Sequence, residues 1–396
     1  MRKRIHIIPI ILILVLSLFM AGKQLVADFY YSMARKDGRD PNRAIRYLNN
    51  CILIDGKNPS FHFTLGREFL RKGLAKAVKR NEQSRWLRES LYEFRKAIDL
   101  RPSSSDYHFH LGINYGAFYY HPAFYWRKIQ DSFVRTAFLN PTDVRHLYTI
   151  GMYYLNEYGR LRNRGWNFGG MWSKDYEHYL LMTKENYQSY FRKLLEVNED
   201  YLGEILQKCF SVTDKYFDLK AVIRETPSDH TFLAKFLHNK GMWEEAKREF
   251  LAAINLEPTN PVHYSAFAYC FYNKGDYENA IYWWQRQKLL NDRDEKIYLT
   301  LADVFIKLRR FDDALKELRD SIDLDPENIN YRIKLIETLI AAQRINEAID
   351  EYRKLMGEHQ DFSKLMYDKM RYYQKTRNYA EAVSILNKAV SSFRNK

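Results

Sequence analysis

The chain has 396 residues, 46% of them apolar and 16% aromatic, with few glycines (16) and prolines (10). This apolar fraction is ordinary for a folded chain, and the abundance of rings with little glycine or proline favours helices joined by short loops. The cysteines lie far apart without a CxxC pair, which argues against a disulfide framework or a cysteine-based zinc site (Cys51, Cys209 and Cys270).

The positive charge is concentrated in the first half of the chain. Of 63 basic and 49 acidic residues, 27 and 26 fall within 227–396, which leaves a net charge of +13 on the first 226 residues. Such an excess attracts anionic lipid headgroups, acidic partners or anionic glycans.

The N-terminus predicts a membrane anchor. A basic tail, residues 1–4, precedes an apolar run at residues 5–22, which spans ~27 Å as a helix at ~1.5 Å per residue and matches a hydrocarbon core of ~30 Å. A cleavable signal peptide is the alternative. It would need a small residue where bulky Phe19 stands before a cleavage after Ala21. We therefore expect an uncleaved signal anchor.

Topology follows from the same segment. Because moving the basic tail across the bilayer is unfavourable, we expect a single-pass protein of the inner (cytoplasmic) membrane, with its N-terminus in the cytoplasm and its body periplasmic or extracytoplasmic.

Residues 23–226 form an irregular, basic and aromatic-rich helical region. Gly66, Gly112 and Gly151 stand at corresponding positions of incomplete repeats, and Pro102 and Pro141 at their ends. Insertions interrupt these repeats, and beyond Gly151 the pattern is lost: residues 158–226 keep a helical period but not the phase.

Residues 227–396 form five repeats of 34 residues, at 227–260, 261–294, 295–328, 329–362 and 363–396. An alanine marks position 20 of each repeat, at Ala246, Ala280, Ala314, Ala348 and Ala382.

Other positions recur in phase. Small residues at positions 8 and 20 let two antiparallel helices approach closely, and large residues at position 24 fill the remaining space. Glycine at position 15 turns the chain between helices, and proline at position 32 ends the second helix. The examples are Ala234, Phe250, Gly241 and Pro258 in the first repeat.

This pattern resembles the tetratricopeptide repeat (TPR) family, whose signature has small residues at positions 8, 20 and 27 and proline at position 32. The similarity is clearest at 240–258, KGMWEEAKREFLAAINLEP, and 307–326, KLRRFDDALKELRDSIDLDP. The resemblance implies an all-α, right-handed superhelical solenoid of antiparallel helix pairs, here preceded by one transmembrane helix.

The resemblance also implies a concave groove for a protein partner, lined by positions 2, 5, 9, 12 and 13 of the first helices. These positions predict a partner-binding groove at Lys235, His238, Asn239, Tyr269, Tyr272, Asn273, Asp303, Lys307, Glu337, Arg371 and Lys375.

No pattern of an active site is present. The sequence lacks a phosphate loop, a nucleophile elbow, an HExxH motif and a dinucleotide fingerprint. His108, His110 and His121 form a histidine cluster, but two histidines in an H-x-H pattern on a helix point apart, so we expect no metal site. The chain is thus expected to be neither an enzyme nor a cofactor-binding protein.

Two basic segments stand out in the first half. The loop RLRNRGWNFGGMW fits either a binding surface, since Arg and Trp dominate binding hot spots, or rings packed beneath the solenoid. Its candidate residues are Arg160, Arg162, Arg164, Trp166, Phe168 and Trp172. The segment 71–80, RKGLAKAVKR, is either a solvated face or a contact for anionic lipid.

Together these features predict a non-catalytic scaffold or assembly protein of a bacterial cell envelope, similar to membrane-anchored TPR proteins of envelope-polysaccharide assembly. The alternative is direct binding of an anionic or sugar polymer by the basic aromatic first half. Nucleic acid is not expected as a ligand, because an outward-facing body would be separated from it.

Overall fold

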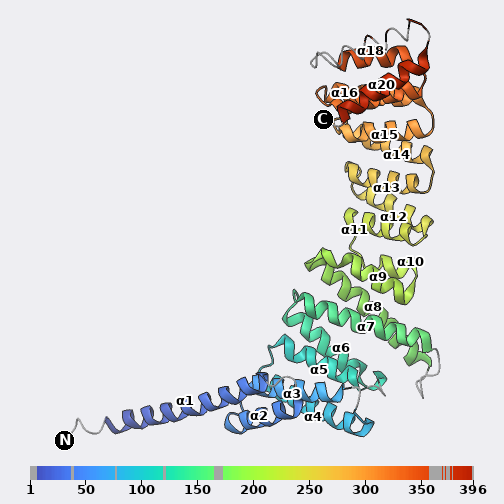
Figure 1. Cartoon of the computed structure of the whole chain (residues 1–396). Helices are drawn as coiled ribbons and strands as arrows, with labels where there is room; N and C mark the ends of the chain where they lie inside the picture. Colours follow the sequence, from blue (N-terminus) through green and yellow to red (C-terminus); the bar gives the residue numbers. More distant parts are fainter. Residues whose placement is uncertain are drawn as a thin grey trace. The chain divides into compact units, whose positions relative to one another are not determined.

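The computed structural model describes residues 7–36, 40–75, 78–118, 122–164, 173–355 and 378–394, together with Asp368, Arg371, Lys375 and Thr376. Within these residues every regular element is a helix (Figure 1). The chain divides into two compact bodies, an N-terminal body (Met1–Arg224) and a C-terminal body (Glu225–Lys396). The predicted all-α stack of antiparallel helix pairs is confirmed.

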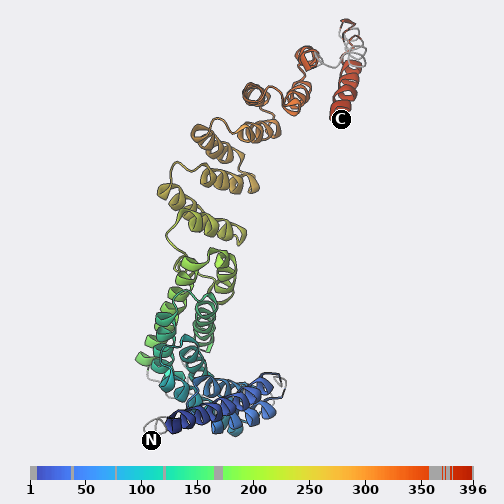
Figure 2. The ribbon, with the colours of Figure 1, turned by 90° about the vertical axis from the view of Figure 1, so that its left-hand side faces the viewer.

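The C-terminal body is a succession of helix pairs, each stacked on the next (Figure 2). The first helices of four pairs begin where the 34-residue repeats begin, at residues 227, 261, 295 and 329. The helices are α11 (Pro227–Asn239), α12 (Trp243–Leu256), α13 (Pro261–Asn273), α14 (Tyr277–Leu290), α15 (Glu295–Lys307), α16 (Phe311–Leu324), α17 (Ile329–Ala341), α18 (Ile345–Leu355) and α20 (Tyr379–Arg394).

The turns between the two helices of these pairs share one backbone conformation. Position 15 has a left-handed conformation in four successive repeats, at Gly241 (φ +79°), Gly275 (φ +80°), Arg309 (φ 57°) and Gln343 (φ 60°). Glycine adopts this conformation without a steric cost, whereas other L-residues do so rarely. The predicted turning role of position 15 therefore extends to two repeats that lack glycine there.

The N-terminal body continues the same pairing with longer helices. Its pairs are α1–α2, α3–α4, α5–α6 and α7–α8, and a short helix follows α9. The elements are α1 (Ile7–Lys36), α2 (Pro41–Ile54), α3 (Pro59–Gly73), α4 (Arg80–Leu100), α5 (Ser105–Ala117), α6 (Pro122–Leu139), α7 (Val144–Arg164), α8 (Ser173–Val197), η1 (Glu199–Tyr201), α9 (Leu202–Thr213) and α10 (Tyr216–Lys220).

Glycines at position 8 lie against phenylalanine rings in three of these pairs. A Cβ on Gly66 would lie 2.8 Å from the Phe94 ring, and one on Gly112 would lie 2.6 Å from Phe133. Such approaches are closer than real Cβ atoms make, so these rings fit only against glycine.

The third such pair corrects the sequence analysis, which lost the pattern after Gly151. A Cβ on Gly151 would lie 2.5 Å from the Phe191 ring, so α7 and α8 form a further helix pair. The two residues are 40 positions apart, against 16 between Ala234 and Phe250. The long α7–α8 hairpin thus moves the two contacting residues further apart in the sequence, but their contact is kept in the structure.

Helix α1 has two parts with different surroundings. Its C-terminal part packs on α2, with Ala27 and Ala34 buried and the Cys51 Sγ donating to the Ala27 carbonyl (3.4 Å). Large apolar side chains are exposed along the preceding part, among them Leu14, Phe19 and Leu25.

The predicted anchor at residues 5–22 begins outside the described residues, and side chains 7–11 and 13 are also outside them. Among the helices that could be examined, none has the length and apolarity needed to cross a membrane.

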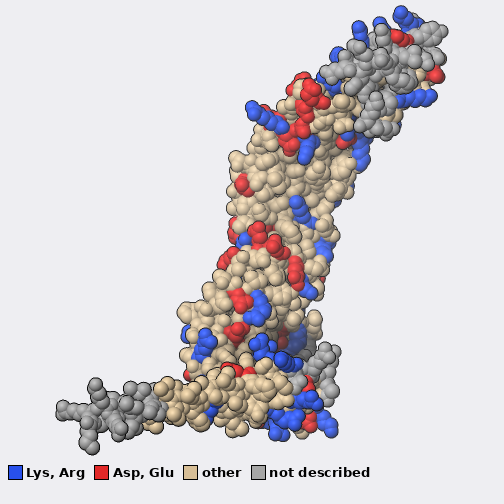
Figure 3. Space-filling view, turned by 60° about the vertical axis from the view of Figure 1, so that its left-hand side comes forward, with Lys and Arg blue, Asp and Glu red and all other residues tan. Residues whose placement is uncertain are grey.

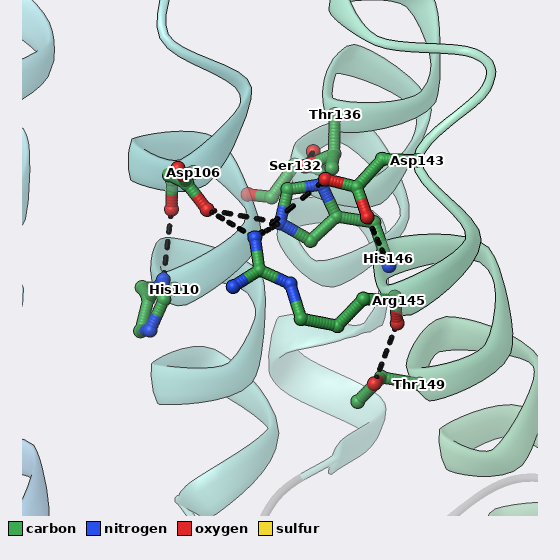
Figure 4. Close-up of polar contacts among 8 residues, drawn as sticks. All are labelled: Asp106, His110, Ser132, Thr136, Asp143, Arg145, His146 and Thr149. Atoms are coloured by element: carbon green, nitrogen blue, oxygen red, sulfur yellow. Dashed lines mark hydrogen bonds and ion pairs between the residues drawn. The ribbon is translucent and has the colours of Figure 1, made fainter.

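A buried histidine ties α5 to α7 (Figure 4). The His146 side chain is 1% exposed, its Nε2 lies 3.1 Å from the Asp106 carboxylate and its Nδ1 lies 3.3 Å from Asp143. Arg145 donates to the same Asp106 oxygen (3.0 Å), and the imidazole stacks on Phe109 at 4.4 Å. Two carboxylates and a ring thus fix the approach of consecutive first helices.

Position 4 of the first helix carries a second recurring device. His62 Nε2 lies 3.0 Å from the carbonyl of Gly56, six residues earlier, and the Tyr264 hydroxyl donates to Pro258 across the same interval (2.8 Å). His62 also pairs with buried Glu93 (2.6 Å). The side chain at position 4 therefore holds the turn that precedes its helix. His62 also holds the second helix of its pair, through Glu93.

His230, at the same position 4, lies between two carboxylates, buried Glu249 (2.5 Å) and exposed Glu225 (3.0 Å). The hydrogen bond to Glu249 raises the pKa of His230 against the opposing effect of burial. Charged His230 therefore stabilises the fold fully below the unfolded pKa of about 6.5, and this contribution is lost as the pH rises through the higher folded pKa.

We predict that Gly151→Ala lowers the free energy of unfolding by about 1–3 kcal/mol, because the added methyl overpacks the Phe191 ring. Adding Phe191→Leu should recover part of that loss, measured by urea unfolding of all four members of the cycle. Gly22→Ala, where nothing lies within 4 Å, is the control and should not destabilise. If the free-energy changes of Gly151→Ala and Phe191→Leu simply added in the double variant, the two residues would not be in contact.

We also predict a pH-dependent effect of His230→Gln. Melting temperatures of the variant and the parent should differ more at pH 6 than at pH 9, because only the parent carries the charged imidazole at low pH. His238→Gln is the control: burial lowers the pKa of His238, so its removal should change the pH dependence in the opposite sense. A difference for His230→Gln that is constant with pH would refute the prediction.

Candidate functional site

A hollow of about 560 Å³ opens between the first helices of two consecutive repeats, α11 and α13. Five of the eleven predicted groove residues lie together in it, and α14 and the turn before α15 contribute to its walls. Its lining includes Lys235, His238, Asn239, Tyr269 and Asn273, with Val262, Ser265, Gln287 and Asp294.

The polar side chains at its rim are free to bind. Lys235, Asn239 and Asn273 are exposed and form no hydrogen bond or ion pair within the described part of the chain. Asn239 and Asn273 occupy position 13 of successive repeats and therefore present carboxamides at a regular interval. These groups can donate to carbonyl or carboxylate oxygens of an extended segment.

One buried polar group at the hollow has no partner. Gln287 is only 9% exposed, and its Oε1 forms no hydrogen bond to the residues that the structure describes. An unpaired buried carboxamide is unfavourable by about 1–3 kcal/mol, so a ligand group that pairs with it would gain this energy. Gln287 is not among the groove residues predicted from the sequence, because it lies on a second helix and the family's groove positions lie on first helices.

Two side-chain rings, Tyr269 and His238, line part of the hollow. Tyr269 is 49% exposed and stands with its edge toward Trp284 at 5.1 Å. His238 packs similarly against Trp243 at 5.5 Å, and burial together with nearby Lys274 lowers the pKa of His238. The site thus offers an imidazole and an open ring between the charges of Lys235 and Asp294.

The remaining predicted groove residues lie elsewhere. Lys307 sits over the rings of Tyr272 (4.9 Å) and Tyr277 (4.6 Å), and Asp303 forms an ion pair with Lys334. Glu337 is partly buried on α17, whereas Arg371 and Lys375 are exposed in a segment otherwise outside the description. Further along the array, the charged groups of Asp303 and Lys307 thus already contact other side chains of the same chain.

Two arginines of the basic aromatic loop have structural partners. Arg160 Nε donates to Glu157 (2.8 Å), and Arg162 donates to the carbonyls of Val212 (2.9 Å) and Thr213 (3.0 Å) at the end of α9. The other candidates, Arg164, Trp166, Phe168 and Trp172, have side chains outside the described residues. The hypothesis of a binding loop therefore loses Arg160 and Arg162 as free contacts.

The histidine cluster shows no convergence. His108 Nε2 lies 3.0 Å from the Pro102 carbonyl and His110 Nδ1 lies 2.9 Å from the Asp106 carbonyl, while His121 is outside the description. Over the described ranges, no group of three or more His, Cys, Asp or Glu side chains could hold a metal ion.

Two protein-family models match within the regular array. A family model described as tetratricopeptide repeat matches residues 305–365, and one described as anaphase-promoting complex, cyclosome, subunit 3 matches residues 246–321. The chain contains tetratricopeptide repeats. TPR proteins bind protein partners and are typically non-catalytic.

Individual similar proteins are distant. Mouse sperm-associated antigen 1 is 26% identical over 183 residues, which cover 45% of this chain and 19% of the mouse protein. The match thus spans about a fifth of the length of this curated relative.

Similar solved structures include a tetratricopeptide repeat protein from Parabacteroides merdae (14% identity, 80% of this chain and 99% of that one, TM-score 0.32). Yeast Tom70 is 13% identical, with coverage of 93% and 99% and a TM-score of 0.31.

Proposed function

We propose that this chain is a non-catalytic, membrane-anchored scaffold that holds an extended segment of a partner protein in the groove between α11 and α13. The observation that carries the proposal is the hollow itself, where unpaired donors meet an open tyrosine ring above the unpaired carboxamide of Gln287. An extended peptide supplies main-chain groups for the carboxamides and side chains for the ring.

Charge and burial support a peptide rather than a small metabolite. The hollow is open along the two helices and contains one unpaired cation, Lys235, which suits a carboxylate or a main-chain carbonyl. An exposed aromatic anchor beside polar donors is the composition expected of a binding hot spot.

We predict that a photo-crosslinking amino acid at Tyr269 captures a discrete partner in cells. Lys235→Ala combined with Asn273→Ala should reduce that adduct at least tenfold, because both changes remove groups that hold the segment. The matched control is the same crosslinker at Tyr282 on α14, which is similarly exposed (45%) but outside the hollow. Equal adducts at both positions, or an adduct insensitive to the double substitution, would refute the groove.

The anchor and the location belong to the same proposal. We infer that residues 5–22 hold the chain in the cytoplasmic membrane, with the N-terminus inside and the repeats outside, where the scaffold would serve assembly of the cell envelope or its polysaccharides. The apolar sequence supports this, as do the exposed side chains of Leu14, Phe19 and Leu25 on α1, which no residue of the described ranges covers.

Reporter fusions after Lys396 test the location. We expect an active alkaline phosphatase fusion and a dark fluorescent fusion, both recovered with membranes and both released into the soluble fraction when residues 1–22 are deleted. A fluorescent fusion with an inactive phosphatase would reverse the topology, and soluble full-length fusions would remove the anchor.

A further inference from the structure

The N-terminal body has two opposite edges. Because successive helices are antiparallel, the α3–α4, α5–α6 and α7–α8 turns share one edge and the α2–α3 and α4–α5 turns share the other (Figure 1). The helices at the first edge carry four exposed or partly exposed cations. We call this set the basic edge: Lys72, Arg85, Arg127 and Lys128.

Each cation of the basic edge lies over aromatic rings. Lys72 Nζ is 3.5 Å from the centroid of Trp86, and the Arg85 guanidinium is 5.4 Å from the same ring. Arg127 lies 5.2 Å from Trp126. A ring face orients a cation and attracts it, but leaves its full charge.

Lys128 completes the set, at 5.7 Å from Tyr115 and 5.8 Å from Tyr125. Next to these rings, Asn114 on α5 donates to the Leu87 carbonyl on α4 (3.3 Å), so α4 and α5 are joined there. The rings that carry the four cations thus lie on α4, α5 and α6.

No Asp or Glu within the described ranges forms an ion pair with any of the four cations, and the one hydrogen bond of Lys72 goes to the neutral amide of Asn42 (2.8 Å). Burial and the nearby Arg85 lower the pKa of Lys72, whereas the carboxylates of Glu82 and Asp40 act on it in the opposite direction.

Several cations of the C-terminal body form ion pairs: Lys288 pairs with Glu317 (2.8 Å), Arg310 with Asp313 (2.8 Å) and Arg344 with Glu347 (2.6 Å). Others lie over rings without an ion pair to any described residue, as the cations of the basic edge do: Lys274 is 4.3 Å from Trp243 and Lys307 is 4.9 Å from Tyr272. Figure 3 shows Lys and Arg on the part of the N-terminal body away from the free end of α1, and also on the C-terminal body.

The position of the basic edge argues against lipid headgroups. Lys72 contacts Asn42 at the start of α2, next to the C-terminal end of α1, whereas the predicted anchor ends at Gly22. The 14 residues from Gly22 to Lys36 correspond to ~21 Å of helix at ~1.5 Å per residue. A bilayer that holds only the predicted anchor would lie that far from this end of the edge.

Ring geometry argues against recognition by stacking. Trp86 stacks on Phe69 (5.7 Å, 16°) and is covered by Lys72, and Trp126 carries Arg127 and the edge of His178 (5.5 Å). The faces that a sugar or a nucleobase would need are occupied. We propose that the basic edge binds an acidic segment of a partner protein, at a surface separate from the α11–α13 groove.

The test measures binding of a fluorescent deca-glutamate peptide to the full chain in detergent by anisotropy. We expect salt-sensitive binding, weakened at least tenfold by Lys72→Gln with Arg85→Gln and again by Arg127→Gln with Lys128→Gln. The matched control, Lys57→Gln with Arg101→Gln, removes the same charge from the opposite edge and should change affinity less than twofold. Circular dichroism and melting temperature establish that every variant is folded.

Three outcomes would overturn the proposal. The first is absence of deca-glutamate binding at low salt, and the second is an equal loss in the control, which would mean net charge without a site. The third is tighter binding of polygalacturonate, an oligonucleotide or anionic vesicles that the edge substitutions abolish, since the edge would then serve that ligand. None of these results bears on crosslinking at Tyr269, so the groove and the edge succeed or fail separately.

Discussion

The contact of a small residue on one helix with a large residue on its partner underlies the whole structure. Gly66 against Phe94 and Ala234 with Phe250 occupy the same two positions in repeats that otherwise differ in length and composition. Because the ring leaves room only for glycine or alanine on the facing helix, this contact sets how closely the two helices of a pair approach. Everything else, including the α11–α13 groove and the basic edge, is built on faces that this pairing leaves outside.

Insertions show how much freedom the pairing allows. The α7–α8 hairpin is longer than a regular pair, yet Gly151 still meets Phe191. A repeat array tolerates such growth because each pair contacts only its neighbours. Added length accumulates at one edge of the N-terminal body, where four cations of the basic edge lie over rings. The two bodies thus share one packing rule.

The sequence predicted the fold better than the site. A fixed interval of 34 residues determines where helices begin, because it reflects a contact that each repeat must make, and Pro227 and Pro261 start helices accordingly. The sequence did not reveal the contact of Gly151 with Phe191, because a long insertion between two contacting residues breaks the 34-residue period. It found Lys235 and Asn273 from family positions but not Gln287, whose missing hydrogen-bond partner exists only in three dimensions. Arg162 looked like a binding residue until its carbonyl partners on α9 were seen.

Helix α1 has a mechanical consequence. It runs without a break from its exposed apolar part into the segment where Ala27 and Ala34 pack on α2. No hinge separates the two parts, since neither a glycine loop nor a proline interrupts the helix after residue 9. A helix of this kind transmits tilt and rotation as a rod does. Whatever fixes the direction of the apolar part therefore also fixes the direction in which the N-terminal body faces, and this body presents its surfaces at a set angle instead of on a flexible tether.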